Sequence, residues 1–223
     1  MPEPFIPAIN PTIARISGVA AILAPILLLV STVAYITDGG GINDGRVGGT
    51  IGVWSALAFA VAFAGITWAI EPLAPRAAPI LLTLAIMGWA AGVGFNTDAI
   101  LSAEFGRAAI DTAIEDDPFA LLAYIPWGWF APISVTATGV VLWRTRAFSR
   151  LSAFLLIVTG VLFVASRPER IEPLAVIADC LAIVALVPIG WTLRASRRTA
   201  VTAPSSAAPL DTERSAHTPE ALA

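Results

Sequence analysis

Residues 173–193 read PLAVIADCLAIVALVPIGWTL, and this stretch decides the class of fold. A helix rises about 1.5 Å per residue, so about 20 mostly apolar residues cross the hydrocarbon core of a bilayer. Pro173 opens the stretch, where the first turn of a helix has no intrahelical use for its N–H group. We therefore expect one membrane-spanning helix here.

Five further stretches have the same character. Together they predict spans over residues 14–36, 50–70, 79–101, 120–143, 151–166 and 173–193. The chain is 57% hydrophobic and 13% charged, with a mean hydropathy of +0.81, which leaves too little polar surface for a water-soluble fold. The sequence thus predicts one all-α domain, an integral membrane bundle of six transmembrane helices over residues 14–194.

The chain ends lie outside this domain. Residues 1–13 form a short N-terminal segment, and residues 195–223 are rich in Ala, Ser, Thr and Pro. Such a composition cannot bury enough apolar area to offset the entropy of ordering, so we expect a disordered tail. Its basic cluster, Arg194, Arg197 and Arg198, is expected to meet lipid headgroups rather than nucleic acid.

The arginines predict the orientation. All 13 basic residues are arginine, and six spans would place both termini on one side of the membrane. That side carries Arg15, Arg76, Arg144, Arg146, Arg150, Arg194, Arg197 and Arg198, whereas the opposite side carries Arg46, Arg107, Arg167 and Arg170. The positive-inside rule therefore predicts cytoplasmic termini.

Several classes of membrane enzyme lack the residues that they need. The absence of lysine excludes Schiff-base chemistry. The only histidine, His217, lies in the tail, so none is available for haem, zinc or a proton relay. Cys180 has no partner for a disulfide, and no serine-hydrolase, nucleotide-binding or zinc-protease motif occurs. We expect no catalytic site, no cofactor and no metal.

Polar residues at membrane depth form the candidate site. Asp179 is expected to lie roughly 10 Å below the outer boundary, where a lone carboxylate must face the bundle interior, pair with a cation or take a proton. Asn96 and Asp98 occur near the same outer end of the third span. Arg167 and Arg170, just before the last span, are the candidate ion-pair partners of Asp179.

These groups predict an outward-opening polar pocket that binds or passes an ion or a small cationic solute. Its residues are Asn96, Asp98 and Asp179, flanked by Tyr124, Trp127 and Trp129. A purely structural ion pair or hydrogen-bond network joining the third and sixth spans fits the pattern equally well.

Two other classes of function stay open. The first is a structural or regulatory subunit that docks another membrane protein through the acidic external loop, residues 102–119, or through the tail. The second is an enzyme acting on lipid, with Asp98 and Asp179 as paired carboxylates. Within the acidic loop, residues 103–114 are expected to form a short helix with Phe105, Ala109 and Ile110 on one side.

Two short patterns resemble a known group of proteins. They are Arg150-Leu151-Ser152-Ala153, leading into Val158-Thr159-Gly160-Val161-Leu162, and the closing Gly190-Trp191-Thr192-Leu193-Arg194. Both resemble the small uncharacterised multipass proteins of bacteria with alanine- and arginine-rich proteomes. The resemblance implies about six helices in a bacterial inner membrane, in line with the hydropathy pattern, and it carries over no functional residues.

Overall fold

The computed structural model describes residues 10–195, with side chains for all of them except residues 120–128. This part of the chain folds into seven helices: α1 (Pro11–Asp38), α2 (Arg46–Ile70), α3 (Ala77–Phe105), α4 (Arg107–Glu115), α5 (Pro118–Thr145), α6 (Arg150–Ser166) and α7 (Glu172–Ala195). Four of these, α1, α2, α3 and α7, are long and apolar enough to cross a membrane, and α6 is a shorter apolar helix. The predicted all-α class is confirmed. The predicted disordered tail lies outside the described residues.

The helices begin where the sequence offers capping groups. Asn10 Oδ1 accepts from the backbone N–H of Thr12 at 3.0 Å, and Ser149 Oγ accepts from that of Ser152 at 3.0 Å. Each cap satisfies a donor that the first turn of a helix leaves without a partner. Pro173 is the second residue of α7, as expected from its position. Six helices therefore cover the six predicted stretches and extend most of them by a few residues.

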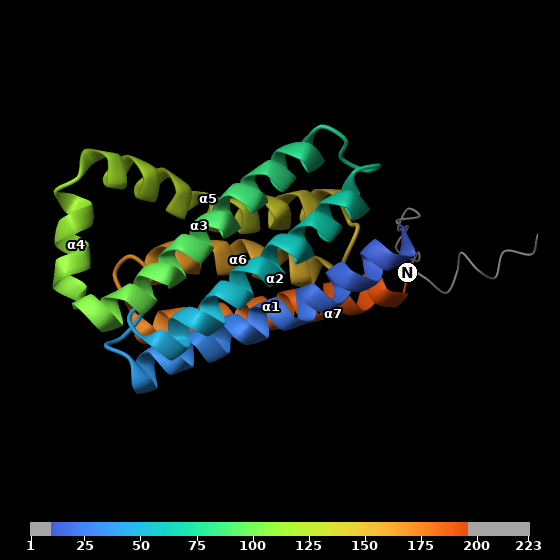
Figure 1. Ribbon diagram of the computed structural model, residues 1–223. Coiled ribbons are helices and arrows are strands. Elements are labelled where there is room, and N and C mark those ends of the chain that lie inside the picture. The colour runs from blue at the N-terminus through green and yellow to red at the C-terminus, as the bar shows by residue number, and fades with distance from the viewer. Residues whose placement is uncertain (1–9, 196–223) are drawn as a thin grey trace, which may run out of the picture.

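The six long helices form a closed ring, in the order α1, α2, α3, α5, α6, α7 and back to α1. Successive helices run in opposite directions, so the described chain begins and ends at the same end of the bundle (Figure 1). The short helix α4 lies across the other end, between α3 and α5 (Figure 1). This arrangement places the α1–α2 loop, the α6–α7 loop and α4 at one end.

The acidic loop differs from its prediction. Residues 103–105 continue α3, and the helix ends at Gly106, whose φ of 84° favours glycine. The short helix therefore begins four residues later than predicted, at Arg107, and ends at Glu115. Arg107 Nε pairs with Asp111 Oδ1 at 2.9 Å, one turn along α4. Gly106 therefore divides the stretch for which the sequence predicted a single helix.

The bundle keeps small and aromatic groups inside and presents large apolar side chains outside. Phe59 of α2 stacks on Trp89 of α3 with ring centroids 4.0 Å apart. Among the exposed large apolar residues are Ile16, Leu23, Trp54, Ile80, Phe154, Val161 and Val184. A surface of this kind on several helices is suited to contact with lipid rather than water.

Candidate functional site

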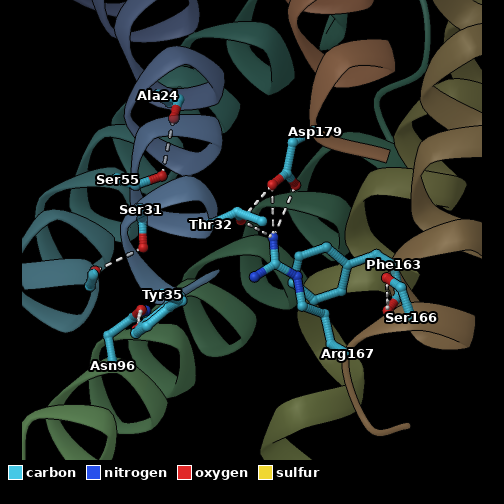
Figure 2. Close-up of polar contacts among 11 residues, drawn as sticks. Ala24, Ser31, Thr32, Tyr35, Ser55, Asn96, Phe163, Ser166, Arg167 and Asp179 are labelled. Carbon is cyan, nitrogen blue, oxygen red and sulfur yellow. Dashed lines mark hydrogen bonds and ion pairs between the residues drawn. The ribbon is translucent and has the colours of Figure 1, made fainter. Parts of the chain in front are cut away.

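A buried ion pair lies at the centre of the site. Arg167, the residue that follows α6, donates from Nη2 to both carboxylate oxygens of Asp179 on α7, each at 2.9 Å. The same nitrogen donates to Thr32 Oγ1 on α1 at 2.9 Å, and Thr32 in turn donates to Asp179 Oδ2 at 2.5 Å (Figure 2). The Asp179 side chain is 1% exposed and that of Arg167 is 10% exposed. The cluster therefore ties α1, α7 and the α6–α7 loop together.

The energetics of buried charges explain why several hydrogen bonds converge on this pair. Each charge alone would be costly at this depth, and their mutual attraction offsets that cost only when the hydrogen bonds are also satisfied. Thr32 supplies both a donor and an acceptor to the pair. The guanidinium carbon of Arg167 also lies 5.1 Å from the centre of the Phe163 ring, a favourable contact for a cation.

A second polar group joins α1 to α2 and α3. Tyr35 donates its hydroxyl to Asn96 Oδ1 at 2.7 Å, and Asn96 Nδ2 donates to the Gly92 carbonyl at 2.6 Å. Ser31, one turn before Tyr35, donates to the carbonyl of Gly48 at 2.7 Å (Figure 2). Asn96 can approach α2 this closely because Gly52 has no side chain, and a Cβ there would overlap Asn96 Oδ1.

Both polar groups border one cavity inside the ring, with a volume of about 460 Å³. The cavity is lined from α1, α2, α3, α5 and α6 and from the two loops at the α4 end. Its lining includes Leu28, Ser55, Trp89, Asn96, Trp129, Phe163 and Arg167. The volume falls within the range of small-molecule sites, about 300–1,000 Å³, and the mixture of apolar walls with a few polar groups is typical of such sites.

The structure brings some of the predicted site residues to this cavity. Asn96 and Trp129 line it. Asp179 lies behind Arg167, which is the member of the pair that lines the cavity. The side chains of Tyr124 and Trp127 lie outside the described residues.

Two predicted residues lie elsewhere. Asp98 is absent from the cavity lining, because it follows Asn96 by two positions and therefore points to the other side of α3. Asp98 and Asp179 thus do not share this cavity. Arg170 pairs with Asp111 of α4 at 3.5 Å rather than with Asp179.

Sequence reasoning missed Thr32, Tyr35, Trp89 and Phe163. Thr32 and Tyr35 could have been identified from the sequence, because they and Ser31 are the polar residues near the end of the first apolar stretch. Their spacing places Thr32 and Tyr35 on one side of a helix. Trp89 and Phe163 carry no such signal, because a single aromatic residue in an apolar helix is as common in a core as in a cavity wall.

The chemistry of the cavity disagrees with a cationic ligand. Among the described residues that line it, the only charged side chain is Arg167, and none is acidic. Within the described residues, no group of three or more His, Cys, Asp or Glu side chains is placed to hold a metal ion. The arrangement offers apolar walls and hydrogen-bond donors.

Comparison with known proteins adds no assignment, since no protein-family model, no curated protein and no solved structure matches this chain.

Proposed function

We propose that this chain is a non-catalytic, six-pass membrane protein that binds a small, largely apolar molecule in its central cavity. The observation that carries the proposal is the cavity of about 460 Å³ inside the helix ring, bordered by a buried arginine. The cavity is partly open at its edge, and its apolar walls, left unfilled, forfeit the contacts that packing would supply. A ligand that fills the cavity restores those contacts.

Six passes are supported by the geometry of the ring. The six long helices pack side by side and alternate in direction, and α6, the shortest of them with 17 residues, still reaches the lower limit of a spanning helix, about 17 residues. The two ends of the bundle also differ in their aromatic and basic residues. Arg150 lies over Trp143 and Arg194 over Trp191, 5.5 and 4.9 Å from the ring centroids, at the end that holds the termini. Such pairs are suited to the headgroup level of a membrane.

Orientation and compartment follow from the arginine distribution and from the resemblance. Among the described residues, six arginines lie at the end that holds the termini and four at the α4 end, which supports cytoplasmic termini in a bacterial inner membrane. The cavity lies toward the α4 end, because Asn43, Arg167 and Pro168 of the two loops there line it. In this orientation the ligand occupies the outer leaflet half of the bundle.

The ligand enters from the side of the bundle in this proposal. Phe95 of α3 and Trp129 of α5 both line the cavity and are 36% and 47% exposed. The helices α3 and α5 spread apart toward α4 (Figure 1). An apolar molecule dissolved in the bilayer therefore meets the exposed Phe95 and Trp129 side chains at the edge of the cavity without crossing water.

Filling the cavity with protein is expected to abolish binding. A Cβ at Gly92 would lie 3.3 Å from Ala56 Cβ and 3.7 Å from the Trp89 ring, and all three residues line the cavity. Gly92→Leu therefore places a side chain in the space that a ligand would occupy. We expect a photoreactive 12-carbon alkane, bearing a diazirine and an alkyne tag, to label Trp89 and Phe163 in liposomes, and labelling to fall about tenfold or more in this variant. Labelled peptides are measured by mass spectrometry.

The matched control is Gly94→Leu. This glycine belongs to the same helix, and a Cβ there meets nothing within 4 Å. Both substitutions remove a helix-weakening glycine and add the same bulk, but only one adds it to the cavity. Labelling is normalised to lipid-facing Ile177 and Val184 of α7. Two outcomes would show that the cavity does not bind apolar molecules. One is equal labelling of Trp89 and Phe163 in Gly92→Leu and Gly94→Leu, and the other is no labelling of these residues in the wild-type chain.

The proposed orientation predicts which residues an impermeant reagent reaches. The background is Cys180→Ser, which removes the lone cysteine. In intact cells, Thr112→Cys on α4 is expected to react with a membrane-impermeant maleimide, whereas Glu71→Cys at the end of α2 reacts only after permeabilisation. The two positions lie at opposite ends of the bundle (Figure 1). The reverse pattern would invert the orientation, and equal labelling of both would argue against a spanning bundle.

A further inference from the structure

We propose that the ligand is electrically neutral and carries a hydrogen-bond acceptor of the carbonyl type, which binds the free terminal nitrogen of Arg167. This inference rests on the proposed function and specifies the chemical class of the ligand. It replaces the ion or cationic solute that the sequence pattern favoured. Three features of the cavity wall support it.

The first feature is an unused donor. Within the described chain, Arg167 donates its hydrogen bonds to Thr32 and Asp179 from Nη2, and none starts from Nη1. Its Nε is buried without a partner. Arg167 is 9% exposed and lines the cavity. Figure 2 shows Nη1 pointing away from Asp179, on the side of Tyr35 and Asn96. Nη1 is therefore a donor at the cavity wall from which a ligand oxygen can accept a hydrogen bond.

The second feature is the charge balance. Asp179 already neutralises Arg167 through two contacts of 2.9 Å. A full anion in the cavity would add an uncompensated charge near Asp179 in a medium of low polarity. A cation would face the guanidinium with no carboxylate in the described lining. A neutral acceptor uses the N–H group and adds no charge.

The third feature is the polarity of the neighbouring group. Asn96 Oδ1 is occupied by the Tyr35 hydroxyl, while Nδ2 makes one bond, to the Gly92 carbonyl. The amide nitrogen carries two hydrogens, so one donor remains. This wall of the cavity therefore offers donors from Asn96 and Arg167. Leu28, Trp89 and Phe163 form apolar walls of the same cavity, so the rest of the ligand has to be apolar.

The test varies only the end group of the photoreactive 12-carbon chain. Four probes end in a methyl ketone, a plain methyl group, a carboxylate or an ammonium group, and each is added to the full chain in liposomes. Labelling of Trp89 and Phe163 is normalised to lipid-facing Ile177 and Val184, which corrects for partitioning into the bilayer. We expect the ketone to label the cavity residues about tenfold more than the plain chain. Equal labelling by these two probes would overturn the inference, as would strongest labelling by the carboxylate or the ammonium probe.

A conservative variant links the preference to Nη1. Arg167→Lys keeps a cation for Asp179 but lacks the second arm of the guanidinium fork. The preference for the ketone over the plain chain is expected to disappear in this variant and to persist in Arg170→Lys, which alters an arginine that is paired with Asp111 outside the cavity. An unchanged preference in Arg167→Lys would contradict the role of Nη1. Failure of all four probes to label the cavity would instead refute the proposed function itself.

Discussion

Arg167→Met is expected to lower the free energy of unfolding by about 3–5 kcal/mol, because it leaves the Asp179 carboxylate buried without its cation. The cost arises from the group that stays behind rather than from the attraction that is lost. Asp179 is almost fully buried, and Thr32 alone cannot replace the two contacts that Arg167 supplies. We expect this variant to be recovered in low yield and to unfold at a markedly lower temperature in detergent.

The double variant Arg167→Met/Asp179→Leu removes both charges and is expected to recover most of the stability, since an apolar pair of similar volume can replace a buried ion pair at little cost. Arg170→Met is the matched control, because its pair with Asp111 at 3.5 Å is solvent-accessible and contributes at most about 1 kcal/mol. Thermal unfolding of the three purified variants, followed by circular dichroism, measures all of these effects. If Arg167→Met lowered the unfolding temperature as little as Arg170→Met does, the buried pair would not hold α1, α7 and the α6–α7 loop together.

The fold was largely predictable because length and hydropathy act on each helix separately. The predicted span 79–101 lies within α3, Ala77–Phe105, and the predicted 151–166 matches α6 to within one residue. Neighbour relations were not predictable. All six stretches are apolar around most of their circumference, so the sequence contains no strong stripe that selects a partner. The closed ring follows from the small residues and hydrogen bonds that join particular helices.

The candidate site was predictable only in part, and the reason is geometric. Depth along a helix follows from residue number, which placed Asn96, Asp98 and Asp179 in one half of the bundle. The direction of each side chain depends on how the helix is rotated within the ring. Asn96 and Asp98 are two residues apart and so point about 200° apart around the axis. One lines the cavity and the other does not. Likewise, two arginines were candidates for Asp179, and only the structure separates Arg167 from Arg170.

Gly88→Ala is expected to destabilise the bundle by about 2–3 kcal/mol, because α3 and α5 approach each other through this glycine. A Cβ at Gly88 would overlap the backbone nitrogen and Cα of Ala131, and backbone atoms cannot turn aside as a side chain can. The two helices would have to separate, and the contacts of Trp89 and Ala131 in the core would loosen with them. Thermal unfolding in detergent measures the loss.

Gly94→Ala is the control on the same helix, where the added methyl group meets no atom within 4 Å. Because alanine is a better helix former than glycine, this variant is expected to be neutral or up to about 1 kcal/mol more stable. The difference between the two variants isolates the close approach of α3 and α5 from helix propensity. The comparison also bears on entry to the cavity, since Gly88 lines it on the same helix as Phe95. Were Gly88→Ala as stable as Gly94→Ala, α3 and α5 would not be in contact at Ala131, and the cavity wall that both helices form would be arranged differently.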